Sequence, residues 1–434
     1  MFFDRPESGE TAILVHIDFP GPNANDNPRE LEELALSAGA DPVEYLFGTR
    51  SEPSSKFFLG KGKVEELAEL VRLHDAKLVI FDHSLTPGQE RNIEREIECR
   101  VLDRTGLILD IFAQRALTHE GKLQVELAQL EHMSTRLIRG WTHLERQKGG
   151  IGLRGPGETQ LETDRRLLRA RIKAITGRLE KVRKQREQGR RARARAEIPT
   201  LSLVGYTNAG KSTLFNRITE ADVYAADQLF ATLDPTLRKL ELNDIGSVIL
   251  ADTVGFIRDL PHKLVESFRA TLQETVEATL LLHVIDAVDE ERREHIAQVN
   301  NVLHEIGADE VPTLEVYNKI DQHEGLEPRI DRDDQGIPVR VWLSARTGVG
   351  TDLLVQALRE RLANDMFHEI VELDHSQGQF RAMLFEQNAV VDEQFTDDGR
   401  IKLEVRLQEK ELRKILSRLD IPHERYLPAE EEQW

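Results

Sequence analysis

The sequence predicts an α/β protein with several domains, arranged around a mostly parallel sheet that carries helices on both faces. Apolar, strand-like runs alternate with amphipathic stretches in residues 1–106 and again in residues 198–364, as in parallel sheets whose strands are connected by helices. A glycine-rich segment, Gly205–Ser212, lies between one such run and the next helical stretch. The chain has 434 residues, which is more than one hydrophobic core usually organises.

Residues 1–106 are expected to form a small parallel α/β domain. Strands are predicted at Ile13–Ile17, Val43–Phe47 and Lys77–Phe81, and helices at Glu30–Ala38, Val64–Leu73 and Pro87–Ile97. Gly60-Lys61-Gly62 precedes the second helix and could present N–H groups to a phosphate. A short Gly-x-Gly is a weak pattern, however, and an ordinary turn is favoured.

Residues 107–197 are predicted to form a long antiparallel helical hairpin. Apolar residues have heptad spacing in two runs: Leu123, Leu127, Leu130, Leu137, Trp141 and Leu144, then Leu161, Leu168, Ile172, Ile175, Leu179 and Val182. Between the runs lies the glycine-rich segment 149–157, which a helix could not cross. We therefore expect two paired helices with a glycine-rich tip and a basic end at residues 190–195.

The charge of the chain is distributed unevenly. The net charge is −19, yet residues 134–197 contain 19 Lys and Arg against 7 Asp and Glu, so the remainder carries −31. A basic segment on an acidic body indicates a polyanionic partner such as RNA. The sequence shows no apolar stretch near the ~20 residues that span a bilayer and no secretory signal. Together with a single cysteine, Cys99, this favours a cytoplasmic protein.

In residues 198–364, polar motifs follow the predicted strands Thr200–Val204, Val248–Ala251, Leu280–Ile285, Thr313–Tyr317 and Val339–Leu343. Ligands of open parallel sheets bind at the carboxyl ends of strands. The candidate nucleotide-binding residues form five groups: Gly205, Tyr206, Thr207, Asn208, Ala209, Gly210, Lys211 and Ser212; Phe230, Ala231, Thr232, Leu233 and Asp234; Asp252, Thr253, Val254 and Gly255; Asn318, Lys319, Ile320 and Asp321; and Ser344, Ala345 and Arg346.

The first group is a phosphate-binding loop, G-x-x-x-x-G-K-[ST], whose N–H groups would face phosphate oxygens. Lys211 is expected to reach the β- and γ-phosphates. Ser212 and Thr232 are the expected Mg²⁺ ligands, with Asp252 acting through water. The N–H of Gly255 would reach the γ-phosphate, and Thr232 would close on the metal only in the triphosphate state.

Asp321 is predicted to select guanine. Its carboxylate can accept hydrogen bonds from N1–H and from the exocyclic amine of guanine, whereas adenine would leave it unpaired. The domain is therefore expected to be a GTPase rather than an ATPase, with residues 344–346 near the guanine carbonyl.

Two residues define the expected chemistry. Phe256 stands where Ras-like switches carry the glutamine that orients the attacking water, so hydrolysis without a partner or an ion should be slow. Asn208 lies in the phosphate loop, where we hypothesise that its carbonyl binds K⁺; the alternative is a side chain that only stabilises the loop. Lys211, Thr232, Gly255 and Asn208 are thus the catalytic candidates.

Residues 365–434 are predicted to form a small α+β module of βαββα order. Strands are expected at Glu369–Leu373 and Lys402–Leu407, and helices at Arg381–Val390 and Lys410–Leu419. Residues 397–399 are typical of a hairpin turn.

The chain resembles the HflX family of ribosome-associated bacterial GTPases. The resemblance lies in the motifs above, in the segment 152–162 (GLRGPGETQLE) and in 224–236 (YAADQLFATLDPT). It implies binding to the 50S subunit and dissociation of stalled 70S ribosomes during stress. Arg154, in the hairpin tip, is the first candidate for an RNA contact. We expect a mostly monomeric protein.

Two other functions stay open. An ATP-driven RNA remodeller would use the N-terminal domain as its motor, since members of the resembled family have been linked to ATP hydrolysis through this region. A protein-binding adaptor, for example of a membrane protease, would use the heptads to meet another coiled coil and could associate peripherally with the membrane.

Overall fold

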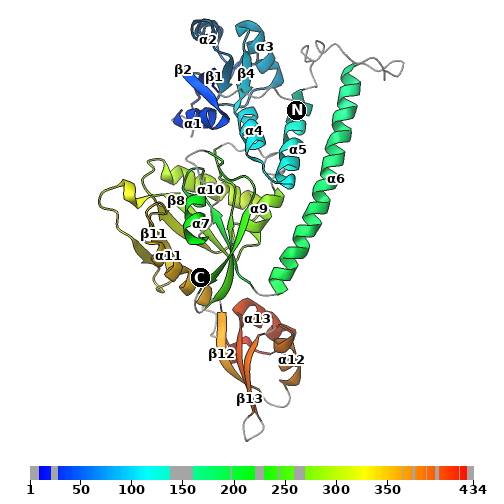
Figure 1. Ribbon diagram of the computed structural model, residues 1–434, viewed down its shortest axis with the longest axis vertical. Helices are drawn as coiled ribbons and strands as arrows, with labels where there is room; N and C mark the ends of the chain where they lie inside the picture. The colour runs from blue at the N-terminus through cyan, green and yellow to red at the C-terminus, as the bar shows by residue number, and fades with distance from the viewer. Residues whose placement is uncertain are drawn as a thin grey trace.

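The computed structural model describes residues 9–20, 28–136, 160–195, 198–219, 229–242, 245–258, 269–364, 366–373, 377–387, 389–395, 400–419 and 421–427. An N-terminal α/β unit, a larger α/β unit and a small C-terminal unit follow one another along the long axis (Figure 1). A long helix, α6, runs beside the first two of them (Figure 1).

The N-terminal unit has one parallel sheet, in the order β2-β1-β3-β4. Its elements are β1 (Glu10–Asp18), α1 (Arg29–Ala38), β2 (Ala40–Thr49), α2 (Lys61–His74), β3 (Leu78–Phe81), α3 (Pro87–Ile97), β4 (Arg100–Asp103) and α4 (Arg104–Arg115). Helices α1 and α4 pack on one face and α2 and α3 on the other. The expected strands and helices are present. Strand β4 and helix α4 were not predicted, and the predicted domain boundary at residue 106 falls inside α4.

Side-chain caps stabilise the first turn of two of these helices. Thr86 and Gln89 form a capping box at the start of α3, and Pro87 stands at its first turn. The Asp103 carboxylate accepts a hydrogen bond from Gly106 N, 2.8 Å away, and caps α4.

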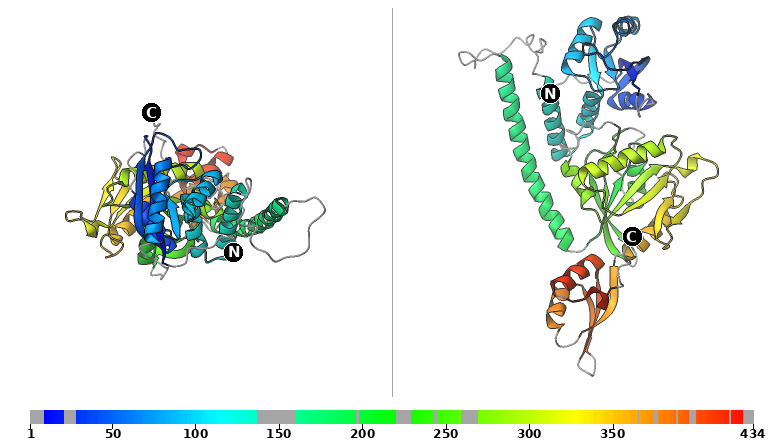
Figure 2. Two further views of the ribbon diagram at one scale, coloured as in Figure 1. Left: turned by 90° about the horizontal axis from the view of Figure 1, so that it is seen from above. Right: turned by 180° about the vertical axis from the view of Figure 1, so that it is seen from behind.

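The expected helical pair is formed by α5 (His119–Arg136) and α6 (Gln160–Arg195), which lie side by side (Figure 2). Their seam contains Leu123, Leu127, Leu130 and Ile175, with Leu168, Ile172 and Leu179 packed against it. Arg171 pairs with Glu126 at 2.6 Å, and Arg186 pairs with Glu120 at 2.7 Å. Residue numbers thus rise on one helix as they fall on the other, so the pair is antiparallel. The glycine-rich tip, Arg154 and the first heptad run beyond Arg136 lie outside the described residues.

The central unit has a seven-stranded sheet in the order β10-β11-β9-β8-β5-β7-β6. Its strands are β5 (Thr200–Val204), β6 (Thr236–Leu242), β7 (Gly246–Asp252), β8 (Leu280–Asp286), β9 (Thr313–Asn318), β10 (Arg329–Arg332) and β11 (Pro338–Trp342). Its helices include α7 (Lys211–Thr219), α9 (Arg269–Val276), α10 (Arg292–Ile306) and α11 (Thr351–Asn364). All five predicted strands are present and pair in parallel. The unexpected strands β6 and β10 add antiparallel edges.

The C-terminal unit has the predicted βαββα order. It contains β12 (Met366–Leu373), α12 (Gly378–Glu386), β13 (Val390–Phe395), β14 (Ile401–Gln408) and α13 (Glu409–Arg418), with the antiparallel order β12-β14-β13. The prediction that the first helix reaches Val390 was wrong: it ends at Glu386, because Val390 and the β-branched Val391 belong to a strand. The predicted turn at 397–399 lies outside the described residues.

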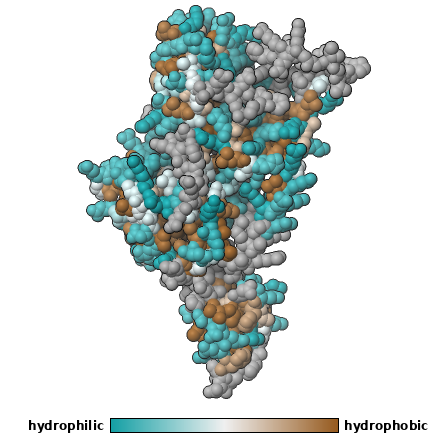
Figure 3. Space-filling model, in the orientation of Figure 1, coloured by the Kyte–Doolittle hydropathy of each residue, from teal (hydrophilic) through white to brown (hydrophobic). Residues whose placement is uncertain are grey.

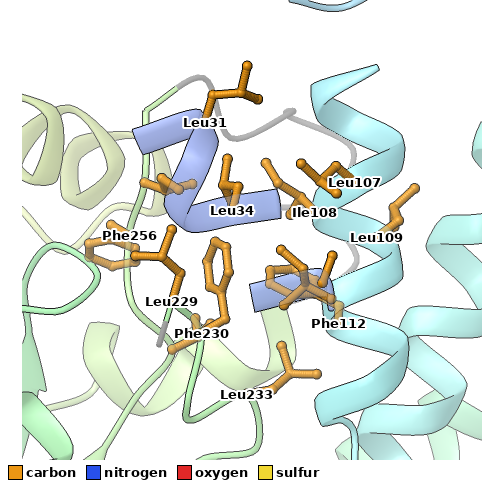
Figure 4. Close-up of a cluster of buried hydrophobic side chains, with 14 of the residues drawn as sticks. Leu31, Leu34, Leu107, Ile108, Leu109, Phe112, Leu229, Phe230, Leu233 and Phe256 are labelled. Atoms are coloured by element: carbon orange, nitrogen blue, oxygen red, sulfur yellow. The ribbon is translucent and has the colours of Figure 1, made fainter. Parts of the chain in front are cut away.

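A hydrophobic core joins the N-terminal and central units. Leu229, Phe230, Leu233 and Phe256 of the central unit pack with Leu31 and Leu34 of α1 and with Phe112 of α4 (Figure 4). The Phe112 and Phe230 rings meet edge to face, 4.7 Å between centroids. This core holds two segments of the predicted nucleotide site against the N-terminal unit: residues 229–234, the first switch, and residues 252–258, the second switch.

Candidate nucleotide-binding site

The phosphate loop joins β5 to α7, and two of its glycines combine a positive φ angle with close contacts to neighbouring residues. Gly210 has a φ of 92° and lies so close to the Asn318 amide that a Cβ would collide with it. Gly205 has a φ of 147°, and a Cβ there would collide with the carbonyl of Val284. Only glycine fits both positions, so the backbone can wrap closely around a phosphate.

Lys211 is buried at the first turn of α7. Its Nζ donates to the carbonyls of Gly205, at 2.9 Å, and of Tyr206, at 2.7 Å. Burial lowers the pKa of this ammonium to about 8, and nearby Asp252 opposes that shift. A triphosphate would offset the desolvation of this ammonium.

Three side-chain oxygens of the predicted metal site meet at one point. Ser212 Oγ lies 2.7 Å from Thr232 Oγ1 and donates to Asp252 Oδ2 at 2.8 Å. Thr232 Oγ1 also donates to Asp252 Oδ2, at 2.9 Å. Asp252 is fully buried, which raises its pKa, although these hydrogen bonds and Lys211 oppose the rise.

This cluster fits Mg²⁺. Asp252 Oδ1 is buried without a hydrogen-bond partner among the described residues, and hydroxyl and carboxylate oxygens are the ligands Mg²⁺ prefers. Ser212 and Thr232 would hold the ion directly and Asp252 through water. The ion would neutralise charge on the transferred phosphoryl group.

The predicted base-binding segments are held together by Asn318, at the end of β9. Its amide donates to the Ala209 carbonyl at 2.9 Å, and its Oδ1 accepts from Ala345 N at 2.8 Å. Asp321 accepts a hydrogen bond from Ser344 Oγ at 2.6 Å, which orients the carboxylate. Lys319 pairs with Asp286 at 2.8 Å. One asparagine therefore ties the phosphate loop to the loop that would read the base.

Phe256 is paired with the phosphate loop through its backbone. Its N–H donates to Gly205 O at 3.1 Å, and its carbonyl accepts from Thr207 N at 2.7 Å. Its ring is 2% exposed and lies in the interdomain core, so it has no polar group to orient water. Gly255 packs so tightly that a Cβ would lie 2.8 Å from Thr207 Cγ2.

A cavity of about 480 Å³ runs between these segments. Predicted residues that line it are Thr207, Asn208, Gly210, Lys211, Ser212, Phe230, Ala231, Thr232, Thr253, Gly255, Asn318, Lys319, Asp321 and Arg346. Thr213 and Gln322 also line it and were not predicted; both directly follow predicted motif residues, which is the signal that could have found them.

Other predicted residues point elsewhere. Leu233 and Val254 are core side chains, and Ile320 is buried in a short 3₁₀ helix. Tyr206 stacks on His295 of α10, with 3.8 Å between ring centroids. The Asp234 carboxylate accepts from Leu117 N and Thr118 N, each at 2.9 Å, before the start of α5. The side chains of these residues contact other parts of the protein, and what they contribute to the site is the backbone conformation of its loops.

Family models match the chain in four consecutive parts. Their descriptions are GTP-binding GTPase N-terminal for residues 25–113, GTP-binding GTPase Middle Region for 115–193, 50S ribosome-binding GTPase for 200–319 and HflX C-terminal domain for 329–426. The GTPase HflX of Escherichia coli (strain K12) is 62% identical over 405 residues, which are 93% of this chain and 95% of that protein. The chain belongs to the HflX family of GTPases. The resemblance and the enzyme class predicted from the motifs are thereby confirmed.

The chain is also similar to a second HflX relative and to a solved structure. The GTPase HflX of Magnetococcus marinus is 46% identical over 369 residues, 84% of each chain. Among solved structures, a GTP-binding protein from the archaeon Sulfolobus solfataricus in complex with GDP is 23% identical, covers 82% of this chain and 99% of its own, and has a TM-score of 0.44. Among the described residues, no helix is both long and apolar enough to cross a bilayer.

Proposed function

We propose that this GTPase binds the large ribosomal subunit through the α5–α6 arm and, with GTP bound, dissociates stalled 70S ribosomes. The outward surface of α6 carries the proposal. Between Thr163 and Gln188, its described and exposed charged side chains are eight cations and one anion, Glu180. The cations are Arg166, Arg169, Arg171, Lys173, Arg178, Lys181, Arg183 and Lys184. Hydrophilic residues follow much of the outer edge of α6 (Figure 3).

Charge of this density is suited to rRNA phosphates. Arg171 pairs across the arm with Glu126, and the seam residues leave the opposite face of α6 to solvent. The family model that matches residues 200–319 is described as a 50S ribosome-binding GTPase, which supports the same partner. Arg154, at the sequence-predicted tip, stays the first candidate for a direct RNA contact.

The cavity residues act as a GTP switch in this proposal. Lys211 and the loop N–H groups hold the phosphates, Ser212 and Thr232 hold Mg²⁺, and Asp321 selects guanine. Since Phe256 cannot orient water, turnover is slow until the ribosome or an ion completes the site. Asn208 lines the cavity and has a φ of 60°, and its side-chain carbonyl is the proposed K⁺ ligand. Equal rates of GTP hydrolysis in Na⁺ and K⁺ buffers would contradict this role of Asn208.

Sedimentation of 70S ribosomes with the protein and GTP, GDP or a non-hydrolysable GTP analogue tests the function. Subunits should separate with GTP or the analogue, and not with GDP. The double variant Lys173→Glu/Lys184→Glu should weaken binding to 50S subunits and reduce its salt dependence. Arg238→Glu/Lys239→Glu, at two exposed positions of strand β6, changes the net charge equally and is the control. Equal subunit separation in GDP would contradict the proposal.

A further inference from the structure

Buried polar side chains of the N-terminal sheet form a cluster at the point where its strand order reverses. The strand order is β2-β1-β3-β4, so the chain adds β2 on one side of β1 and then β3 and β4 on the other, and the order reverses between β1 and β3. Open parallel sheets bind ligands at such a point. Asp82 directly follows β3 and is 3% exposed. It is bonded to His16 of β1, with Nδ1 and Oδ2 2.7 Å apart, and to Arg104, whose Nη1 donates to Oδ1 at 2.6 Å.

A side chain from the central unit joins this buried cluster. Arg258, 9% exposed, donates from Nη2 to Asp82 Oδ2 at 3.1 Å. Its backbone carbonyl accepts a hydrogen bond from Arg104 Nη2 at 3.2 Å. Arg258 lies two residues after Phe256, at the end of the second switch, and was not among the predicted site residues. The N-terminal domain thus binds part of the switch as an open sheet binds a ligand.

The same contacts reach the phosphate loop. The Tyr206 hydroxyl donates to Glu30 of α1, and Arg104 pairs with that same carboxylate. Arg258 N donates to the Tyr206 hydroxyl at 2.9 Å. The carbonyl of Tyr206 is one of the two that hold Lys211. A continuous series of bonds therefore connects Asp82 with the lysine that would bind the γ-phosphate.

The first switch is held from the same side. Leu229 N donates to Ser37 Oγ of α1 at 3.1 Å, and Phe230 packs on Phe112 of α4. Asp234 accepts the two N–H groups that precede α5. Between these attachments lies Thr232, with its hydroxyl 2.7 Å from Ser212 Oγ. With the domains docked, the switch threonine is where a triphosphate state needs it.

We propose that Arg258 is a positioning residue that gives the site its preference for GTP over GDP. Bonded to Asp82, it fixes the second switch, while the shared core and Asp234 fix the first with Thr232 facing the metal position. Domain docking and GTP binding then strengthen each other, because coupling between two sites is reciprocal. This inference requires the GTPase site alone and does not depend on the ribosome.

Nucleotide affinities of the full chain test this role. Arg258→Met keeps the apolar stem and removes the charge. With Mg²⁺ present, its Kd for a non-hydrolysable GTP analogue should rise about tenfold, within the usual range for coupled sites, while its Kd for GDP changes far less. Arg258→Lys should recover part of the loss. Arg340→Met is the matched control, because Arg340 pairs with Glu315 at 2.6 Å on the same domain and away from both switches.

Equal weakening of both nucleotides, or an unchanged ratio of the two Kd values, would overturn the proposal. Hydrogen exchange on the wild-type chain provides a test that does not require the variant to fold. Amides of α1 and α4 should be better protected with the GTP analogue than with GDP. Equal protection with both nucleotides would also overturn it.

Discussion

At the scale of single residues, Asp321 makes the sharpest prediction. Its carboxylate is oriented by Ser344 and is the acceptor that matches the two guanine donors. Asp321→Asn should reduce GTP affinity about 100-fold, because its NH₂ group would face the exocyclic amine of guanine and the remaining hydrogen bond from N1–H would lose its charged acceptor. The amide should instead accept xanthosine nucleotides, which offer an acceptor at the exocyclic position. Calorimetry with both nucleotides measures this, and the exposed Asp334→Asn is the control. Retained GTP affinity would contradict the assignment.

Thr232 should discriminate between nucleotide states only when the metal is present. Thr232→Ala is expected to lower affinity for a GTP analogue about tenfold in Mg²⁺, from the loss of one ligand, and to leave GDP affinity nearly unchanged. Thr232→Ser retains the hydroxyl and should behave as wild type. With EDTA in place of Mg²⁺, the alanine variant and the wild type should bind the GTP analogue with the same affinity. A difference that persists in EDTA would mean that Thr232 acts otherwise.

The sequence reveals some site residues and hides others for a physical reason. The phosphate loop and its glycines could be predicted because a backbone cradle is made by adjacent residues. Arg258 and Glu30 could not, since their partners lie far along the chain: Tyr206 and Glu30 are separated by 176 positions. The only local hint at Arg258 was its place two residues after Phe256.

At the scale of elements, periodicity was informative where an element buries one whole face. The heptad spacing predicted the α5–α6 seam because both helices repeat the same apolar stripe. Strand β10, with the sequence Arg-Ile-Asp-Arg, lacks an apolar pattern and forms only by pairing with β11 at the sheet edge. Strand β4 has four residues, too few for a clear alternation.

Ile175 should carry much of the stability of the arm. It is fully buried in the seam between the two helices, whereas Leu167 on the same helix is 61% exposed. Ile175→Ala should cost about 2–5 kcal/mol, and Leu167→Ala about 0.5 kcal/mol or less. Hydrogen exchange of the α5 and α6 amides in each variant measures the difference. Equal exchange in both would show that the seam does not hold the arm.

At the scale of the whole molecule, the interface between the N-terminal and central units combines ion pairs with apolar packing. The core of Figure 4 buries both switches against α1 and α4, and the network around Asp82 lies beside it. The order of the domains along the chain could be predicted from the sequence. The position of the switches in the domain interface could not, because that depends on side chains of three separate segments meeting.

Because His16 lies in this network, the stability of the folded protein should depend on pH. The hydrogen bond to Asp82 raises the pKa of His16, Asp18 adds to the effect, and burial opposes it. Asp18, Asp82 and the His83 ring face it, with Arg104 and Arg258 bound to the same Asp82. Since the folded-state pKa exceeds the unfolded value of about 6.5, this stabilisation is complete below that pH. It is lost as pH rises through the folded-state pKa.

As pH rises from 6 through that pKa, the free energy of unfolding should therefore fall more steeply than it would without His16. His16→Asn should abolish this part of the slope while keeping a polar side chain beside Asp82. Urea unfolding at a series of pH values, with wild type and variant compared at each, isolates the histidine from other groups such as His295, whose pKa is also raised. Parallel pH curves for the two proteins would mean that His16 does not change its protonation on folding, and that the Asp82 network is held by its arginines alone.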